Sequence, residues 1–377
     1  MKILLIPILL TQLAFADSSV KDMIESMKIH KAQNLDLIAQ NFAYNKKLLD
    51  EAREYYRQYI SKEWGDKNIK LSEVKSFTQY SPDLKSRETI DYENEKIVVE
   101  KVVDINEKIS KEELANNLKT LMKQSIDETY EKDPINKKIS QETKEKPILP
   151  QEKIVSDLIS AKEIKKSKIT EKIVTLKDGS QKKIVAMEVK MVPDNLKKRA
   201  VKFKTIVDKE AERFSVPKSY VFATIQTESY FNPLAKSHIP AFGLMQIVPH
   251  TAGIDAYQAL YGEKKLLTGA YLYNPKNNIE LGSQYVQIIS TRYLRGVKNP
   301  TSLLYCTAVS YNAGIGSLYR SFTGSKGDRK GAIAKINSMS DEEVYTFLRN
   351  SPKLTSEAKN YVKAIRDRRK NYVAWDM

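Results

Sequence analysis

The chain has 377 residues, of which 41% are hydrophobic, so it is long enough for two domains of ordinary size with real cores. Its 63 Lys+Arg outnumber its 47 Asp+Glu, and the net charge of +16 favours a polyanionic partner without selecting nucleic acid, anionic lipid or wall polymer. The three histidines lack the spacing of zinc ligands and no phosphate-binding glycine motif occurs, so the sequence supports neither a metal nor a nucleotide cofactor.

The first 16 residues have the pattern of a secretory signal peptide. A basic start at Lys2 precedes an apolar run, and small residues at Ala14 and Ala16 suit cleavage by a signal peptidase. The apolar run is too short for a permanent membrane-spanning helix, although an uncleaved anchor is the alternative. We expect a periplasmic mature chain that starts near Asp17, and no lipoprotein cysteine follows the apolar run.

Residues 17–64 suit a helix, because their apolar positions recur in steps of three and four. Two later segments change to a period of two and indicate β-hairpins. The first hairpin covers residues 89–99 and turns at residues 93–95. The second covers residues 172–192 and turns at Asp178-Gly179, the kind of dipeptide that a tight hairpin turn favours.

Between the hairpins, residues 110–130 indicate a helix that opens with the capping pattern Ser110-x-x-Glu113. Residues 131–153 contain three prolines among lysines and glutamates, which favours a loop or mobile connection. We therefore expect residues 17–192 to form an α+β domain. Its Lys/Glu-rich surface is a solvated surface or, alternatively, a dedicated binding patch.

From residue 193 onward the period is helical, and no strand pattern follows Val192. One apolar face spans residues 196–214, and Ser215 and Pro217 open a second helix that must end before Asn232-Pro233. Further helices are expected at residues 278–293, 301–311, 315–322, 329–338, 340–348 and 355–372. We therefore expect residues 193–377 to form an all-α domain.

Cys306 is the only cysteine of the chain, so it has no partner for an intramolecular disulfide. It lies in the apolar helical run over residues 301–311. This setting favours a buried small hydrophobe over a reactive nucleophile.

Glu228 is the strongest candidate for a catalytic residue. Residues 220–262 contain only two other charged side chains, although 29% of the chain is charged. Val221, Ile225 and Glu228 share a helix face, so Glu228 is expected to point inward from the last helical turn. Burial and the negative end of the helix dipole both raise the pKa of a carboxyl group, as a general acid near neutral pH requires. The alternative is a glutamate that faces solvent or pairs with a basic residue.

The order of four motifs resembles the soluble-lytic-transglycosylase-like catalytic domain shared with goose-type lysozymes. These motifs are Glu228-Ser229 with Asn232-Pro233, GLMQI at 243–247, YNAG at 311–314 and Tyr361. Further matches look like the membrane-bound lytic murein transglycosylase C family, namely residues 243–253, 299–302, 336–339 and, in the first half, 63–65 with the first hairpin. The resemblance implies a lysozyme-like fold for residues 193–377 and that family's own N-terminal domain for residues 17–192.

The resemblance also implies roles for individual residues. Glu228 matches the sole catalytic acid, and Tyr361 matches a tyrosine that hydrogen-bonds near it. Substrate-binding residues are expected on both walls of a glycan groove: Ser237, Met245 and Gln246 on one wall, Tyr311 and Asn312 on the other. The sequence departs from the family at Pro240, where members often have glycine, and in lacking a lipid-bearing cysteine.

Most glycosidases use two carboxylates, whereas this motif set supplies one, because nothing matches Asp255 or Glu280 to a catalytic acid. The resemblance implies that Glu228 protonates the β-1,4 bond between N-acetylmuramic acid and N-acetylglucosamine. The ionised Glu228 would then take the C6 hydroxyl proton, closing a 1,6-anhydro ring without any cofactor. A hydrolytic muramidase and a non-catalytic wall-binding module are the alternatives.

The expected partner is therefore the glycan strand of peptidoglycan. A nucleic-acid partner is not expected, because the secretion signal removes the chain from the cytoplasm. An association with the outer membrane or with other cell-wall proteins stays open.

Overall fold

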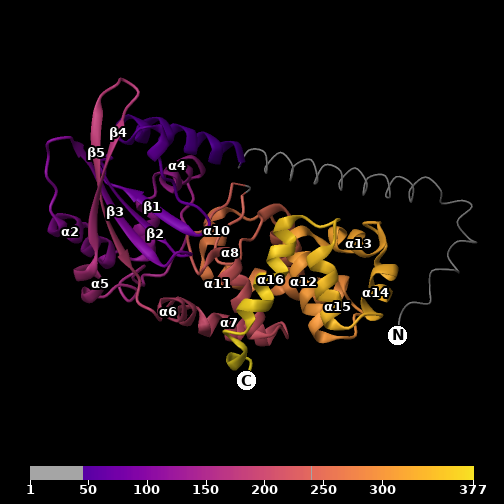
Figure 1. Cartoon of the computed structure of the whole chain (residues 1–377). Helices are drawn as coiled ribbons and strands as arrows, with labels where there is room; N and C mark the ends of the chain where they lie inside the picture. The colour runs from indigo at the N-terminus through magenta and orange to yellow at the C-terminus, as the bar shows by residue number, and fades with distance from the viewer. Residues whose placement is uncertain (1–45, 239) are drawn as a thin grey trace, which may run out of the picture. The chain divides into compact units, whose positions relative to one another are not determined.

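The computed structural model describes residues 46–238 and 240–377, and Figure 1 shows the order of their elements. The predicted signal peptide and the first part of the predicted helix, residues 17–45, lie outside the described residues, while residues 46–64 are helical as predicted. Residues 48–377 form one compact unit, so the predicted division at residues 192/193 stays a prediction. Among the described helices, none is both long and apolar enough to cross a membrane.

An antiparallel five-stranded sheet, in the order β1-β2-β3-β5-β4, forms the centre of the N-terminal part (Figure 1). Its strands are β1 (Ser76–Tyr80), β2 (Ser86–Asp91), β3 (Lys96–Asp104), β4 (Lys168–Thr175) and β5 (Gln181–Lys190). Both predicted hairpins are confirmed, because β2 pairs with β3 and β4 pairs with β5. Gly179 in the second turn has a φ of 84°, a left-handed conformation that glycine adopts without a steric cost. β1 was not predicted, since four of its five residues are buried and the strand shows no alternation.

The helix predicted over residues 110–130 is wrong in its extent, because the structure divides it into α2 (Lys111–Lys123) and α3 (Ile126–Lys132). Ser110 caps α2 as predicted. Ser125 starts the second helix, because its hydroxyl accepts the Glu128 N–H while the Glu128 carboxylate accepts the Ser125 N–H. This reciprocal capping box favours a new helix start over a continuous helix.

The loop predicted over residues 131–153 is wrong in part, because the segment contains α4 (Pro134–Thr143). The Asp133 carboxylate accepts the N–H groups of Ile135 and Asn136, and Pro134 occupies the first helical position. A proline there has no N–H to leave unsatisfied, so it starts this helix instead of interrupting it. The short α5 (Ala161–Lys166) then leads into β4.

The two faces of the sheet bury different groups. One face places Phe77, Ile90 and Val99 in the main core with the apolar residues of α2. The opposite face packs Tyr80 and Val102 in a smaller cluster with residues of helix 46–64. This alternation follows from the period of two along each strand.

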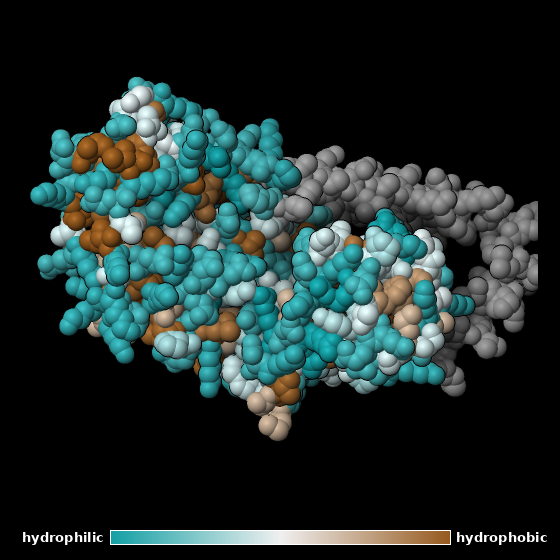
Figure 2. Space-filling view, in the orientation of Figure 1, coloured by the Kyte–Doolittle hydropathy of each residue, from teal (hydrophilic) through white to brown (hydrophobic). Residues whose placement is uncertain are grey.

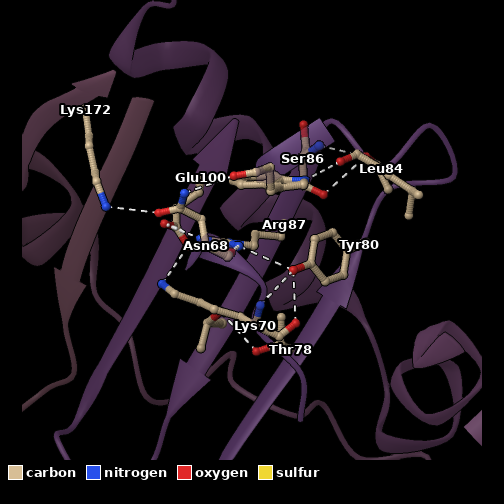
Figure 3. A network of polar contacts seen from close by, with 12 residues as sticks. Asn68, Lys70, Thr78, Tyr80, Leu84, Ser86, Arg87, Glu100 and Lys172 are labelled. Carbon is tan, nitrogen blue, oxygen red and sulfur yellow. Dashed lines mark hydrogen bonds and ion pairs between the residues drawn. The ribbon is translucent and has the colours of Figure 1, made fainter. Parts of the chain in front are cut away.

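A buried ion pair lies on the second face (Figure 3). Arg87 is fully buried and binds Glu100 with two hydrogen bonds, Nε to Oε2 at 2.7 Å and the second nitrogen to Oε1 at 2.8 Å. Lys70 donates to the same Glu100 carboxylate at 2.9 Å, and the Arg87 guanidinium stacks 3.9 Å from the centre of the Trp64 ring. The paired geometry is what makes a buried charge tolerable in this sheet.

The C-terminal part is helical, as predicted. The continuous helix predicted over residues 196–214 is divided into α6 (Asn195–Lys202) and α7 (Lys204–Arg213) at Phe203, which has non-helical angles. The apolar face nevertheless continues through the break, because Phe203 is buried and stacks on Phe231 at 6.4 Å. Beyond β5, the described residues hold no further strand, only isolated bridges at Lys236–Phe242 and Phe242–Ile247.

The other helices agree with the predicted ranges within a few residues, and three short elements were not predicted. The confirmed helices are α8 (Lys218–Ser229), α11 (Pro275–Gln287) with η3 (Ile288–Tyr293), α12 (Pro300–Ala313), α13 (Ile315–Thr323), α14 (Arg329–Asn337), α15 (Asp341–Asn350) and α16 (Ser356–Arg369). The additional elements between α8 and α11 are η2 (Pro249–Gly253), α9 (Ile254–Tyr261) and α10 (Gly269–Tyr273). Two 3₁₀ turns, η1 (Asp66–Asn68) and η4 (Val373–Trp375), complete the described elements.

The helix α8 packs against α7, α16 and η4, and α12 packs against α16. The main apolar core continues from the sheet into these helices, so the two parts of the unit share one core.

Cys306 of α12 is fully buried, as predicted, and burial raises the pKa of its thiol. Hydrophilic residues cover most of the visible face of the described chain (Figure 2). The predicted fold class, an α+β part followed by an all-α part, is confirmed.

Candidate active site

The helix α8 carries Glu228 in its last turn. Every residue from Ser219 to Gln226 is buried, so the helix is surrounded by protein on all sides. It ends at Tyr230, and both Tyr230 and Phe231 adopt left-handed angles, with φ of 51° and 63°. Two consecutive non-glycine residues in this region are uncommon and turn the chain sharply away from the helix axis.

The Glu228 carboxyl accepts a hydrogen bond at 2.7 Å from the hydroxyl of Tyr361 in α16. Burial raises the pKa of Glu228 to about 7; the Tyr361 hydrogen bond opposes the shift, Glu357 adds to it, and Lys75 opposes it. The residue as a whole keeps some accessible surface, so a carboxyl surrounded by protein is still within reach of a substrate. A carboxyl with this pKa exists in both protonation states near neutral pH, which suits an acid that later acts as a base.

Two stacked tyrosines, Tyr311 and Tyr361, lie next to the Glu228 carboxyl and form one wall of the candidate site. The rings of Tyr311 and Tyr361 lie 6.5 Å apart with an angle of 14° between their planes, and Tyr285 meets Tyr311 edge-on at 5.7 Å. Burial raises the pKa of both Tyr311 and Tyr361, so both phenols stay neutral donors. The Tyr311 hydroxyl donates to the backbone carbonyl of Met245 at 2.8 Å, which links α12 to the segment 243–247.

The segment 243–247 is fixed by Asn278 of α11. The Asn278 side chain accepts the Met245 N–H at 2.7 Å and donates to two backbone carbonyls, those of Phe242 and Leu272. Gly243 has a φ of 73°, and a Cβ there would lie 2.5 Å from the Asn278 amide. A larger residue at 243 would therefore displace Asn278 and the segment it holds.

Met245 is fully buried and packs on Gly282, where an added Cβ would lie 2.3 Å from the Met245 sulfur. Met245 therefore supports Tyr311 in two ways: its backbone carbonyl accepts the Tyr311 hydroxyl, and its side chain fills the space next to Gly282. Gln246 adopts a φ of 48° and donates its side-chain amide to the carbonyls of Ala235 and Gly243. Ser237 hydrogen-bonds with Ala241 through its N–H and its hydroxyl. These hydrogen bonds hold Ser237 and Gln246 within their own loop and do not join them to Glu228.

Asn312 leads to a residue that sequence reasoning did not assign. Its side-chain amide donates to Glu357 at 3.0 Å, and Glu357 is the exposed carboxylate that adds to the raised pKa of Glu228. Glu357 lies four residues before Tyr361 in α16, so the two share one helix face. The four-residue spacing between Glu357 and Tyr361 is the one sequence feature that indicates a second carboxylate near Glu228.

Glu280 and Asp255 lie elsewhere. Glu280 is bound by Arg213 at 2.6 Å and by the Tyr261 hydroxyl at 3.0 Å, which is a structural arrangement. Burial raises the pKa of Asp255, and the charges that oppose this are Arg292 and Lys264. In the described residues, no cluster of His, Cys, Asp and Glu side chains could hold a metal ion.

The N-terminal part contributes directly to the surroundings of Glu228. Lys75, next to β1, lies 5.1 Å over the Tyr230 ring and pairs with Glu93 at 2.8 Å. Arg199 is buried and donates to the backbone carbonyls of Tyr92, at 3.0 Å, and Tyr230, at 2.6 Å. The tip of the first hairpin and the end of α8 are thus joined through one guanidinium.

A buried ion pair makes a second connection. The Lys236 ammonium donates to the Asp133 carboxylate at 3.1 Å and to the Asn136 side chain at 2.8 Å, and it has almost no exposed surface. Since Asp133 also caps α4, the loop after α8 is fixed by a helix of the N-terminal part. Lys236 is close to Glu228 in the sequence, but the sequence alone does not predict that its partner is Asp133.

Both parts of the chain match known protein families. Residues 205–333 match the family described as Transglycosylase SLT domain. Residues 42–202 match the family described as Membrane-bound lytic murein transglycosylase C, N-terminal domain. The chain is therefore a relative of the membrane-bound lytic murein transglycosylase C proteins, and the predicted resemblance is confirmed.

Curated relatives carry the same name. The chain is 39% identical over 189 residues to membrane-bound lytic murein transglycosylase C of Serratia proteamaculans (strain 568), a range that covers 50% of this chain and 51% of the relative. It is 40% identical over 184 residues to the protein of that name from Yersinia pestis (strain Pestoides F), covering 49% and 50%. The chain thus spans about half the length of the curated relatives it matches.

Two solved lytic transglycosylases share only a partial similarity. The lytic transglycosylase Slt of Pseudomonas aeruginosa has 22% identity and a TM-score of 0.33, covering 45% of this chain and 24% of that chain. The 70 kDa soluble lytic transglycosylase of Escherichia coli has 24% identity and a TM-score of 0.33, covering 46% and 24%.

Proposed function

We propose that this chain is a peptidoglycan lytic transglycosylase, a lyase that leaves a 1,6-anhydromuramoyl end. The observation that carries the proposal is the hydrogen bond between Glu228, which lies within the residues that match the Transglycosylase SLT domain, and Tyr361 of α16, which lies beyond the end of that match. The raised pKa of Glu228, about 7, supports a single residue that gives and then takes a proton. No cofactor takes part in this proposal.

Two proton transfers balance the reaction. Glu228 protonates the oxygen of the β-1,4 bond between N-acetylmuramic acid and N-acetylglucosamine, and that C–O bond breaks. The acetamido group of the muramic acid stabilises the cation at C1. The ionised Glu228 then takes the proton from the C6 hydroxyl of the same sugar, whose oxygen bonds to C1. Glu228 ends protonated as it began, and no water is consumed.

The other predicted site residues are proposed to hold the glycan around Glu228. Tyr311 and Asn312 would face it from α12, and Ser237 and Gln246 from the loop after α8. Met245 would support this wall through its carbonyl, which accepts the Tyr311 hydroxyl. We propose that the enzyme acts on glycan strands in the periplasm, and the name of its relatives, membrane-bound lytic murein transglycosylase C, supports an association with a membrane.

Glu357 gives the hydrolytic alternative a specific basis. Inverting glycosidases pair their acid with a second carboxylate that activates water, and Glu357 is a second carboxylate whose charge acts on Glu228. The Asn312 amide already binds Glu357 at 3.0 Å, which favours a role at the rim over that of a base. Hydrolysis would leave a reducing end that is one water heavier than the anhydro end.

The product mass decides between these functions. Purified sacculi are digested with the wild type, Glu228→Gln and Glu357→Gln, and the soluble muropeptides are weighed by mass spectrometry. We expect anhydro products from the wild type and from Glu357→Gln, and none from Glu228→Gln. Hydrated products from the wild type would establish a muramidase instead. Binding to sacculi without soluble products from any variant would establish a wall-binding module.

A further inference from the structure

A pocket of about 620 Å³ lies in the N-terminal part, and none of the residues that line it belongs to the candidate active site. Its walls come from helix 46–64, the end of β1 and the start of β2, and the helices α2, α3 and α4. A volume of this order is within the range of pockets that bind small ligands.

The pocket reaches a buried polar pair on the sheet face that packs into the main core. Gln79 of β1 and Glu88 of β2 stand directly opposite each other in the strand register. They lie on the face that buries Phe77 and Ile90 in the main core, and each is less than one-tenth exposed. The Gln79 amide donates to the Glu88 carboxylate at 3.1 Å, and burial raises the pKa of Glu88. A polar pair at such positions weakens an apolar core unless it has a use.

Two residues that line this pocket each carry a buried side-chain oxygen that has no hydrogen-bond partner among the described residues. These oxygens belong to Gln79 and Gln124, and they remain unpaired within residues 46–238 and 240–377. Gln79 is 4% exposed and Gln124 is 5% exposed. Because a buried acceptor without a donor is costly to keep, two of them in one pocket point to a ligand that brings donors.

The charged residues that line the pocket limit which ligands with hydrogen-bond donors fit it. Glu88 and Glu131 line it together with Lys132 and Lys137, so its formal net charge is zero. The lysines oppose an isolated ammonium group, and the glutamates oppose an isolated carboxylate. Tyr56 adds an aromatic ring to the wall, against which a flat apolar surface packs. A neutral ligand with several donors and an apolar ring face has the chemistry of a saccharide.

We propose that this pocket binds a saccharide unit through the acceptors of Gln79, Gln124 and Glu88. Its hydroxyl and acetamido N–H groups would satisfy the two unpaired amide oxygens, and its ring would pack on Tyr56. The identity of the saccharide as part of a peptidoglycan strand rests on the proposed function. The N-terminal part would then hold the strand at a second point, apart from the site of cleavage.

Trp64 is a natural reporter for this pocket. Its indole N–H donates to the Leu84 carbonyl at 2.6 Å, and its ring meets Tyr80 edge-on at 5.9 Å. Leu84 and Tyr80, both labelled in Figure 3, line the pocket. The chain has two tryptophans, so replacing Trp375 with Phe leaves Trp64 as the only indole.

The test is a fluorescence titration of the full chain carrying Trp375→Phe and Glu228→Gln, with the tetramer of N-acetylglucosamine as the probe. The second substitution prevents cleavage of the probe. We expect a saturable change in Trp64 emission. Adding Gln79→Leu with Gln124→Leu should raise the apparent Kd at least about tenfold, because two hydrogen bonds are lost. The matched control is Gln181→Leu, an exposed glutamine of β5, which should leave the titration unchanged.

A second variant keeps the test informative if the variant with Gln79→Leu and Gln124→Leu, both buried positions, does not fold. Thr120 is an exposed residue at the same pocket, and Thr120→Phe should fill the mouth and abolish the response without touching the core. The absence of any Trp64 response to the tetramer overturns the proposal, as does a response that both Thr120→Phe and the Gln79/Gln124 variant leave intact. A response to lysine or diaminopimelate in place of the saccharide overturns the ligand class. Failure of the proposed function would appear in the product masses and would leave this titration unaffected.

Discussion

Tyr361 donates its hydroxyl to Glu228 at 2.7 Å across 133 residues of sequence, and this hydrogen bond joins α16 to the end of α8. It stabilises the ionised carboxylate and so opposes the pKa increase that burial causes. The two largest influences on the Glu228 pKa are therefore desolvation, which raises it, and the Tyr361 hydrogen bond, which lowers it, while the charges of Glu357 and Lys75 act more weakly in opposite directions.

Replacing Tyr361 with Phe should raise the pKa of Glu228 above about 7, since the hydrogen bond that favours the ionised form is removed. The general acid would then stay protonated to higher pH, so the alkaline limb of the pH–rate profile should move upward, by about one unit or less. The rate at the optimum should fall about tenfold, because the carboxyl loses its orienting partner. The measurement is the release of soluble muropeptides from sacculi between pH 5 and pH 9.

Tyr319→Phe is the matched control, because Tyr319 is also a buried tyrosine whose hydroxyl donates, at 2.7 Å, to a carbonyl outside the site. It should leave the position of the alkaline limb unchanged. A downward shift in Tyr361→Phe would contradict the proposed balance.

Glu228→Gln should stabilise the fold at alkaline pH. The folded pKa of about 7 lies above the ordinary value of 4.5, so the folded chain binds more protons than the unfolded chain between these values. Wild-type stability therefore falls as pH rises through this window, by up to about 3 kcal/mol at pH 8. The amide carries no charge and lacks this cost. Chemical denaturation should show the variant more stable than the wild type at pH 8 and nearly equal at pH 4; an equal difference at both values would show that the cost is not electrostatic.

The sequence predicted the participants of the site better than their contacts. Glu228 was predicted because it is an isolated carboxylate on the inward face of an apolar helix, and Tyr311 and Tyr361 were predicted from the order of the motifs that resemble the family. Glu357 was not assigned a role, because an exposed glutamate on a charged helix has no distinguishing feature except its four-residue spacing from Tyr361. Lys75 could not be found at all, since its effect on Glu228 depends on how the sheet packs against α8.

For the fold as well, features that depend on neighbouring residues could be predicted from the sequence, whereas contacts between distant residues could not. Gly179 and the Ser340–Glu343 capping box were readable, because a turn or a cap depends on a few neighbouring residues. The Ser125–Glu128 capping box carried an equally local signal that was overlooked within a longer helical pattern. The burial of Lys236 could not be predicted, because its partner Asp133 lies 103 residues away in the chain.

Lys236→Met should destabilise the fold by about 3–5 kcal/mol, because it leaves the buried Asp133 carboxylate without its counter-charge. Adding Asp133→Asn should recover part of this loss, since the amide removes the charge and its oxygen still caps α4. The free energies of unfolding of the two single variants and the double variant give the coupling. Lys138→Met is the control: Lys138 pairs with Glu142 on the surface, where solvent screens the charges, so its loss should destabilise the fold far less than the loss of Lys236. Simple additivity of Lys236→Met and Asp133→Asn would contradict a direct ion pair.

Asp376 should act as a remote cap of α8. Pro217 precedes this helix and offers no side-chain cap, but the Asp376 carboxylate accepts the Ser219 N–H at 2.7 Å and the Ser219 hydroxyl at 2.6 Å. A negative charge at a helix N-terminus is favourable, so Asp376→Ala should cost about 1 kcal/mol of stability while Asp376→Asn should cost less. Thermal unfolding of both variants and of Met377→Ala, an exposed neighbour, measures the difference. Because α8 holds Glu228 at its other end, a loss of activity in Asp376→Ala at temperatures well below its unfolding transition would show that the cap also positions the acid.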